Sequence, residues 1–295
     1  MALSHPFRLL STCCCLDFAE PHDSPTNQTN NMPSDAHVSP RSTAPNFAQF
    51  ASEDFVQGAG VAIFHLASER VVICSAVDRR HGLFHFLPKG RRDAGEDTRT
   101  GAEREGYEEV CFVLFAMVTV SILTAMQSGY RNRLLPLPTF HRQPQAHPRV
   151  SAPSLTAEPI WIQMMPLGHG SKQYLLYWYI AETIPPELEK ELESKSGEAY
   201  KPPPPYPSDL KLRDRLKLEP EGYEPIHHEG TGVDEEEQTY QSHLVTIGEA
   251  VQKLGKNGVM ADVVLRGWKA IQDRYALEDG INSESPQQTA GSLVS

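Results

Sequence analysis

Three glutamates near the middle of the chain have the spacing of a metal site. Glu105, Glu108 and Glu109 stand at positions i, i+3 and i+4 of an expected helix, so their carboxylates share one face of that helix. Carboxylates without a partner repel one another, and a cation must hold them together. Hard oxygen ligands of this kind suit Mg²⁺ best, with Mn²⁺ as a substitute. The sequence therefore predicts a divalent metal site on this helix.

An arginine and a fourth glutamate extend the pattern towards the N-terminus. Arg104 is next to the predicted ligands but on another line of the helix surface, and we expect it to pair with Glu96 and brace the loop before the helix. Asp97 or Thr98 can cap the helix start. Taken alone, the stretch from Arg104 to Glu109 is also typical of a solvated charged face, so the wider spacing has to decide.

The wider spacing resembles the Nudix box, whose pattern is G-x5-E-x7-R-E-U-x-E-E-x-G-U, where U is a bulky apolar residue. The matching positions are, in order, Gly90, Glu96, Arg104, Glu105, Glu108 and Glu109. Leu87, Pro88 and Lys89 are similar to the strand-to-loop entry of the family. Two positions depart from the pattern. Gly106 stands where a bulky apolar residue is usual, and Cys111 with Phe112 replaces the closing Gly-U.

An uncharged, apolar segment, residues 110–127, follows Glu109 directly. If it is removed, the sequence reads R-E-G-Y-E-E-S-G-Y, and Gly129 and Tyr130 close the box in the expected places. Gly129 also suits the left-handed turn that ends many helices. We interpret the segment as a translated intron, because its valine codon begins with GT, its last codon, for glutamine, can be CAG, and its removal keeps the frame. The alternatives are a genuine insertion and a membrane span, for which about 17 residues is the short limit.

The composition excludes some classes of function. The net charge of −11 argues against a nucleic-acid polymer as the partner, because a phosphate backbone requires a basic face. Five cysteines, an odd and unpatterned number, fit a reducing compartment better than a disulfide scaffold. The first residues lack the long apolar stretch of a secretory signal. We expect a cytoplasmic protein, with the nucleus as a second location, and no dependence on a membrane.

The chain is expected to contain one folded domain with tails. Residues 1–50 and 281–295 are polar and lack a periodic apolar pattern, which predicts disordered tails. The domain is expected over residues 55–275. Within it, residues 184–241 form a long, polar and proline-rich insertion.

Runs of β-branched and aromatic residues predict the strands of this domain, and two amphipathic segments predict its last helices. The expected strands are Gly58–Leu66, Arg70–Val77, Leu83–Leu87, Arg131–Leu137, Glu158–Pro166 and Gln173–Glu182. The expected helices beyond the box are Thr246–Leu254 and Val259–Tyr275, the second with Val263, Val264, Trp268 and Ile271 available to pack on the sheet. The fold class is therefore α+β, a mixed sheet sandwiched between helices, which is the arrangement of the Nudix fold.

The resemblance implies a reaction, which is the hydrolysis of a diphosphate linkage in a nucleoside diphosphate derivative or a related polyphosphate. The catalytic set that it implies is Glu105, Glu108, Glu109, Arg104 and Glu96. The three helix glutamates of this set would bind Mg²⁺ or Mn²⁺, with the carbonyl of Gly90 as a further ligand.

Three cations beside the metal face, Lys89, Arg91 and Arg92, can bind substrate phosphates, and ordinary solvated loop charge is the alternative. The stretch Leu-Pro-Lys-Gly with basic followers is similar to the branch of the family that acts on diphosphoinositol polyphosphates and diadenosine polyphosphates. The partner is thus expected to be a small nucleotide or inositol polyphosphate. Two other readings stay open: a non-catalytic Nudix module that binds a phosphorylated ligand, and an inactive product of a mis-spliced gene model.

Overall fold

The structure is a computed structural model of the 295-residue chain. It describes residues 42–78, 82–108, 128–139, 155–167, 172–192, 200–229, 241–256 and 258–280. Glu109, the segment 110–127 and nearly all of the two predicted tails lie outside these residues. In the part that is described, no helix is long and apolar enough to cross a membrane.

One mixed sheet forms the middle of the domain. Its strands are β1 (Phe55–His65), β2 (Arg70–Asp78), β3 (Gly82–Phe86), β4 (Lys89–Arg91), β6 (Asn132–Leu134), β7 (Trp161–Leu167), β8 (Lys172–Thr183) and β10 (Gln241–Thr246). The order across the sheet is β10-β2-β1-β8-β6, while β3 pairs with β2, β4 with β1 and β7 with β8. β1 and β8 run parallel, and the other pairs in this sheet run antiparallel. Two further strands, β5 (Ser128–Tyr130) and β9 (His227–Glu229), form a separate antiparallel pair.

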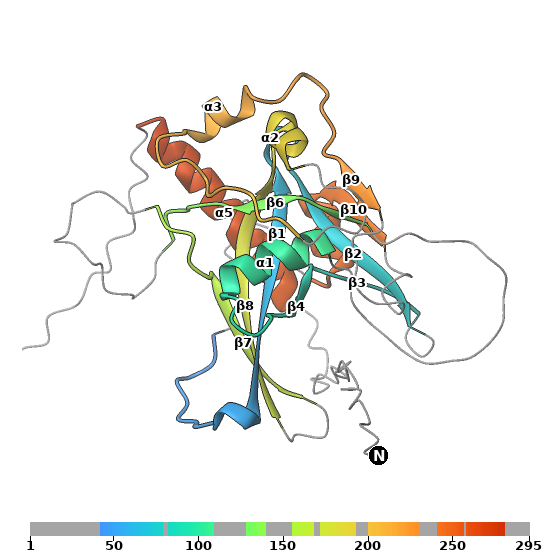
Figure 1. Cartoon of the computed structure of the whole chain (residues 1–295), viewed down its shortest axis with the longest axis vertical. Helices are drawn as coiled ribbons and strands as arrows, with labels where there is room; N and C mark the ends of the chain where they lie inside the picture. Colours follow the sequence, from blue (N-terminus) through green and yellow to red (C-terminus); the bar gives the residue numbers. More distant parts are fainter. Residues whose placement is uncertain are drawn as a thin grey trace, which may run out of the picture.

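Helices lie on both faces of the sheet (Figure 1). They are α1 (Thr98–Glu108), α2 (Pro186–Glu191), α3 (Leu212–Leu216), α4 (Ile247–Lys253) and α5 (Val259–Glu278). In Figure 1, α1 crosses in front of β1 and β8, and α5 runs behind them. The predicted α+β class, a mixed sheet between helices, is therefore confirmed.

Most predicted strands appear within a few residues of their expected bounds, but the one predicted over Arg131–Leu137 is shorter. β6 ends at Leu134 because the chain changes partner around Pro136, which has no N–H to donate to a ladder. The N–H of Leu135 still donates to the carbonyl of Ile180 at 2.9 Å, whereas that of Leu137 donates to Thr156 at 2.9 Å.

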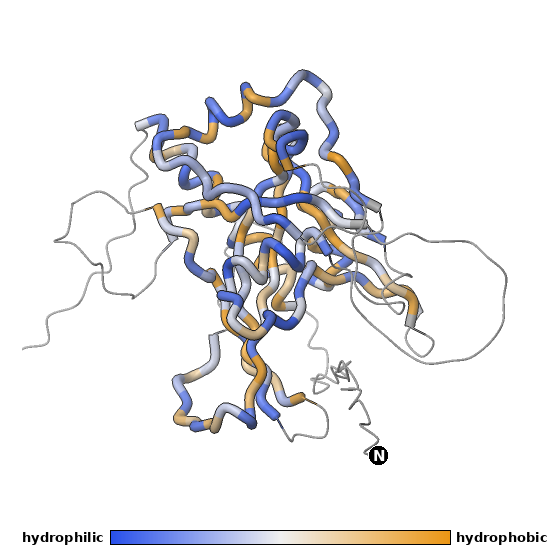
Figure 2. Tube along the Cα trace, viewed as in Figure 1, coloured by the Kyte–Doolittle hydropathy of each residue, from blue (hydrophilic) through white to orange (hydrophobic). Residues whose placement is uncertain are grey.

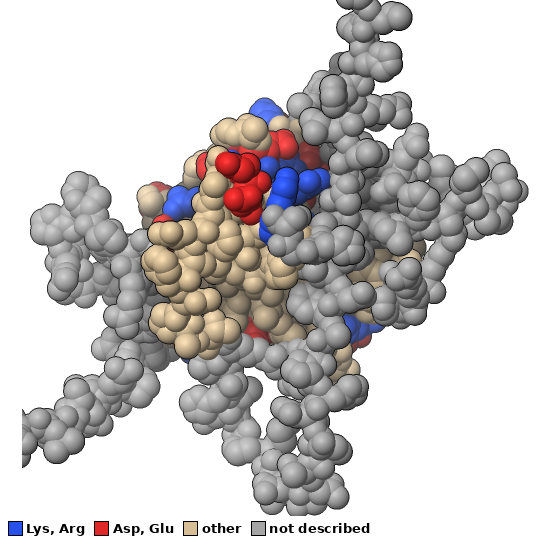
Figure 3. Space-filling view, turned by 90° about the horizontal axis from the view of Figure 1, so that it is seen from below, with Lys and Arg blue, Asp and Glu red and all other residues tan. Residues whose placement is uncertain are grey.

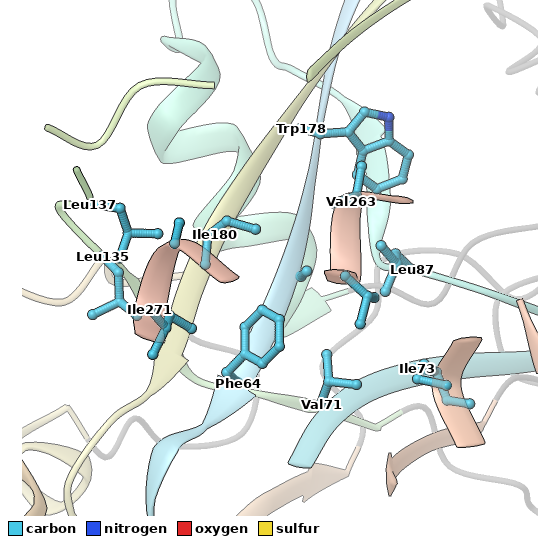
Figure 4. Packing of buried hydrophobic residues seen from close by; sticks show 14 of the residues in the cluster. Phe64, Val71, Ile73, Leu87, Leu135, Leu137, Trp178, Ile180, Val263 and Ile271 are labelled. Carbon is cyan, nitrogen blue, oxygen red and sulfur yellow. The ribbon is translucent and has the colours of Figure 1, made fainter. Parts of the chain in front are cut away.

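The two faces of the sheet bury separate clusters, because successive side chains of a strand point to opposite faces. On the α5 face, Val263 and Ile271 pack with Phe64 and Trp178 (Figure 4). Trp268 of α5 stacks on Phe64 with ring centres 5.8 Å apart. The residues that we expected α5 to bury on the sheet are in this cluster or packed against it, so that prediction is confirmed.

The opposite face lies under α1, which is mostly hydrophilic (Figure 2) and cannot dock through large apolar side chains. It approaches the sheet through small residues instead. A Cβ at Gly106 would stand 2.4 Å from Nδ2 of Asn132 and 2.8 Å from Cδ1 of Ile63. Asn132 Nδ2 donates to the carbonyl of Glu103 at 2.8 Å. The departure of Gly106 from the box pattern is thus compensated, because Ile63 fills the space from the sheet side.

The described part of the predicted insertion packs on the domain through buried ion pairs. Arg215 of α3 is 1% exposed, and its Nε lies 2.8 Å from Oε2 of Glu182 on β8. Arg133 of β6 lies 2.6 Å from the other oxygen of the same glutamate. Arg215 Nη2 donates to Glu219 at 2.7 Å, and Glu219 in turn contacts His65. Because breaking a buried pair costs about 3–5 kcal/mol, residues 200–229 are an integral part of the fold.

Tyr107 and Gly129, which lie close to the two ends of the segment 110–127 in the sequence, meet at the end of α1. A Cβ at Gly129 would stand 2.0 Å from the carbonyl oxygen of Tyr107 and 3.1 Å from its Cα, so the two backbones are in direct contact. Gly129 lies in β5 and does not have a positive φ, so the expected left-handed turn is wrong and the glycine serves close approach. Without residues 110–127, Tyr107 and Gly129 would be i and i+4, the separation that a helical turn brings together.

We predict that deleting residues 110–127 keeps the fold, raises the solubility and thermal midpoint and increases Mg²⁺-dependent hydrolysis. The contact between Tyr107 and Gly129 already exists in the intact chain, and the deletion removes apolar surface that otherwise has to be buried. Both forms should be compared in solubility, thermal unfolding and turnover.

A deletion that is one residue shorter is the control. A chain lacking only residues 110–126 places Gly129 at i+5 from Tyr107 and should not show the same gain. Transcripts should also be sequenced across the codons of Glu109 and Ser128. If mature transcripts keep the segment and the intact chain is as soluble and active as the deletion form, the segment is a genuine part of the protein.

Candidate active site

The helix that carries the predicted ligands begins at a well-defined cap. Asp97 Oδ1 accepts hydrogen bonds from the N–H groups of Arg99 at 2.8 Å and Thr100 at 2.9 Å, so Asp97 takes the N-cap role predicted for Asp97 or Thr98. The bond from the Thr100 N–H is the main cause that lowers the pKa of Asp97. Thr98 is hydrogen-bonded to the hydroxyl of Tyr179 at 2.7 Å, which holds the first turn of α1 on β8.

Arg104 is the centre of the site. Its Nε and Nη2 each donate to one oxygen of Glu96 at 2.9 Å, which is the expected pair in bidentate form. Its Nη1 lies 2.9 Å from Oε1 of Glu105 and 3.0 Å from Oε2 of Glu108. Nη2 also donates to the carbonyl of Arg91 at 3.0 Å. One guanidinium therefore joins the loop after β4 to three glutamates of the box.

The charges of this cluster are unequally compensated. Burial would raise the pKa of Glu96, but the hydrogen bonds from Arg104 and from the Asp93 N–H outweigh it and lower that pKa. Burial raises the pKa of Glu108, and Arg104 offsets this only in part. For Arg104, burial would lower the pKa, but the neighbouring glutamates hold it above its ordinary range. Arg104 thus neutralises Glu96 well and leaves negative charge uncompensated at Glu108.

Glu105 is brought against the box glycine. Its side chain is nearly buried, with 6% of the residue exposed. A Cβ at Gly90 would stand 2.1 Å from Oε2 of Glu105, so only glycine allows this approach. On the other side of the same peptide, the Gly90 carbonyl accepts a hydrogen bond from the Tyr174 hydroxyl at 3.0 Å.

The residues present fit a divalent cation as far as they are described. Glu105 and Glu108 both lie within 3.0 Å of one nitrogen of Arg104, so their carboxylates converge. Oxygen donors of this kind suit Mg²⁺ and Mn²⁺. The third predicted ligand, Glu109, lies outside the described residues, within which no group of three His, Cys, Asp or Glu is arranged to bind a metal. A complete site therefore depends on Glu109, which stays a prediction.

The three predicted phosphate-binding cations lie around β4 and the loop that follows it. Arg92 braces the loop, because its Nε donates to Gln57 Oε1 and its Nη1 to the Glu96 carbonyl, each at 2.7 Å. Lys89 Nζ lies 6.0 Å from the ring centre of Phe86, and Arg91 is exposed. Seen from below, acidic and basic side chains gather in one place beside an uncharged surface (Figure 3). Phosphate binding by the three cations stays a prediction.

A cluster that the sequence pattern did not indicate covers the C-terminal end of α1. The guanidinium of Arg131 lies 4.4 Å from the ring centre of Tyr107, and its Nε lies 3.2 Å from Oε1 of Glu189. The rings of Tyr200 and His228 lie 5.5 Å and 5.3 Å from that of Tyr107. These five residues come from five separate parts of the chain, so no local motif could have revealed them. They hold the C-terminal end of α1 against the segment that contains β9.

Comparisons with known proteins were made for the whole chain. No family model matches it, and no curated protein matches it. Solved structures to which it is similar include a NUDIX hydrolase from Nitrosomonas europaea, with 10% identity, a TM-score of 0.34, and coverage of 73% of this chain and 89% of that one. Two structures of a C. elegans Ap4A hydrolase, one of them a binary complex, each share 14% identity and cover 74% of this chain and 98% of theirs, with TM-scores of 0.33 and 0.29. At these scores the likeness does not bear on function, which depends on the residues of the site.

We predict that Arg104→Met lowers the free energy of unfolding by about 3 kcal/mol, because it leaves three largely buried carboxylates without their shared cation. Arg99→Met on the same helix is the matched control. Arg99 is 54% exposed and pairs with Glu158 at 2.9 Å, so its loss should cost at most about 1 kcal/mol. Urea unfolding of the three proteins measures both values. Equal losses would show that Arg104 is no more than a surface charge.

Proposed function

We propose that the chain is a Mg²⁺-dependent Nudix hydrolase that cleaves a diphosphate linkage in a dinucleoside polyphosphate such as diadenosine polyphosphate. The observation that supports this most is the convergence of Glu105 and Glu108 on one nitrogen of Arg104, beside the backbone of Gly90. The same residues have the spacing of the Nudix box. A solvated charged face would not bury Glu105 or place it against a glycine of another element.

The side chains of the site have separate tasks in this proposal. Mg²⁺ bound by Glu105, Glu108 and Glu109, with the Gly90 carbonyl, would polarise a phosphoryl oxygen and activate water. Arg104 holds Glu105 and Glu108 in register, and Glu96 holds Arg104 by a bidentate pair. The cations before the helix would neutralise the charge that develops on the leaving phosphate.

The contacts that the described cations make within the protein favour a linear polyphosphate substrate over a diphosphoinositol polyphosphate. Arg92, Arg99 and Arg104 are each engaged within the protein, by Gln57 and Glu96, by Glu158, and by the box glutamates. Three acidic residues, Asp93, Glu96 and Asp97, follow the basic ones along the loop. An inositol ring with phosphates all around it requires a broad basic surface, whereas a linear chain requires a few cations along one line.

A screen with Mg²⁺ tests the reaction and the substrate class together. Dinucleoside polyphosphates, sugar nucleotides and inositol pyrophosphates should be offered to the intact chain and to the form without residues 110–127, with products followed by phosphorus NMR. Faster turnover of dinucleoside polyphosphates is the expected result. Binding of a phosphorylated ligand by both forms with no turnover would instead support the non-catalytic module, and activity of the deletion form alone would support the mis-spliced product.

We predict that Glu105→Gln and Glu109→Gln each lower kcat by at least about 100-fold while the fold is kept, since each removes a charged metal ligand. Both changes belong in the form without residues 110–127. Glu221→Gln, an exposed position outside the site, is the control and should leave kcat unchanged. Near-normal Mg²⁺-dependent turnover of either ligand variant would remove that glutamate from the metal site.

We predict that Lys89→Ala raises KM several-fold more for a dinucleoside polyphosphate than for a sugar nucleotide, because the longer substrate leaves more negative charge without a partner. The difference should shrink with added salt. Lys217→Ala is the control, because Lys217 is 75% exposed and pairs with Asp214 on α3. Equal small effects on both substrates would return Lys89 to ordinary loop charge.

A further inference from the structure

Tyr174 reaches the box glycine from a different strand. It lies near the start of β8, is 8% exposed and belongs to the core cluster on the α5 face. Its hydroxyl donates to the carbonyl oxygen of Gly90 at 3.0 Å. Between them lies β1, which pairs with β8 on one side and with β4 on the other. The hydrogen bond therefore links the two strands that flank β1.

A glycine in β1 makes this bond possible. A Cβ at Gly58 would stand 2.0 Å from the Tyr174 hydroxyl and 2.5 Å from the Gly90 carbonyl oxygen. Any other residue at position 58 would occupy the space through which the bond runs. The tyrosine, the two glycines and their contact thus form one unit, of which only Gly90 belongs to the Nudix box pattern.

The opposite side of the same glycine faces Glu105. The Glu105 carboxylate occupies the space where a Cβ of Gly90 would stand, with Oε2 at 2.1 Å and Oε1 at 2.5 Å from that position. The residue is therefore held from two sides, by a hydroxyl on its carbonyl and by a carboxylate on its Cα. Gly90 is also paired with Ala59 in the ladder between β1 and β4, so the hydroxyl adds to a carbonyl that the sheet already holds.

The backbone around Gly90 is held by a short ladder, by the N–H of Val61 on the Pro88 carbonyl at 2.9 Å and by Arg104 on the Arg91 carbonyl at 3.0 Å. β4 is three residues long and pairs with β1 over Lys89, Gly90 and Arg91 alone. Just beyond it, the N–H of Arg92 donates to the carbonyl of Gln57 at 3.3 Å, which is a long hydrogen bond. Glycine also has the widest range of backbone conformations. Loss of the hydroxyl would leave the orientation of the Gly90 carbonyl to these contacts alone.

We propose that Tyr174 is a positioning residue for the metal site, whose hydroxyl fixes the Gly90 carbonyl and thereby keeps Glu105 in place. The proposal rests on the proposed function, because the group to be positioned is a ligand set for a divalent cation. Removing the partner that orients a ligand typically costs 10–100-fold in metal affinity or activity. A purely structural tyrosine would change stability and leave metal affinity as it was.

The test is Tyr174→Phe, with Tyr206→Phe as a matched control. Tyr206 is 6% exposed and belongs to the same core cluster, but its hydroxyl has no hydrogen-bond partner among the described residues. Mn²⁺ affinity is measured by electron paramagnetic resonance of the free ion, and the thermal midpoint by circular dichroism. The intact chain is used, with the form lacking residues 110–127 alongside. Gly58→Ala is the second variant, because its Cβ displaces the same hydrogen bond without changing the tyrosine.

We expect Tyr174→Phe and Gly58→Ala to raise the Kd for Mn²⁺ by about tenfold or more, and Tyr206→Phe to leave it unchanged. Tyr174→Phe should lower the thermal midpoint slightly, because it loses a hydrogen bond, whereas Tyr206→Phe should not lower it. If the wild type binds Mn²⁺ and Tyr174→Phe binds it equally well, or if Tyr206→Phe weakens it as much, the positioning role is wrong while the proposed function stands. If neither wild-type form binds Mn²⁺ or hydrolyses a substrate, the proposed function fails and the positioning role fails with it.

Discussion

The structure of the site depends on one guanidinium shared by three carboxylates. Glu96, Glu105 and Glu108 come from a loop and from two positions of α1, and all three lie within 3.0 Å of Arg104. Without this cation the same carboxylates would repel one another, and the loop would lose its bidentate contact with the helix. A loop that is tied in this way to the helix of the predicted metal ligands is organised before any ligand binds. Such preorganisation lowers the cost of placing ligands around a cation.

Close backbone approach provides the second constraint, because α1 has little apolar surface. Gly106 admits Ile63 and Asn132, and Gly90 admits Glu105. At each point the glycine has no side chain, which allows a close contact in place of an apolar one. Hydrogen bonds such as that from Asn132 to the Glu103 carbonyl fix the orientation of α1. α1 is therefore held on the sheet by close contacts and hydrogen bonds more than by buried apolar surface area. A methyl group added at these positions would require the partner side chains to move.

Local patterns allowed much of the fold to be predicted. Alternating and continuous β-branched runs located β1, β2 and β8 within a few residues, and the 3.6-residue period located α5. The pairing of Arg104 with Glu96 also followed from spacing. The supports from elsewhere could not be predicted in this way. Tyr174 contacts Gly90, and Arg215 contacts Glu182, across long stretches of sequence with no motif to connect them. Such contacts depend on strand order, which a single sequence does not specify.

The chain can carry residues 110–127 between the two halves of the box because each half is held in place separately. The first half ends at the last turn of α1, and the second begins with Gly129 against Tyr107 and with the buried Tyr130. β5 pairs with β9 and not with a neighbour in sequence, so the closing half keeps its place without a short covalent link. Closing a loop of about 20 residues costs only roughly 3 kcal/mol in chain entropy. A domain of ordinary stability, about 5–15 kcal/mol, can tolerate that cost. The greater threat from the segment is therefore its apolar surface, at about 1.5–3 kcal/mol for each large side chain left unburied, and not its length.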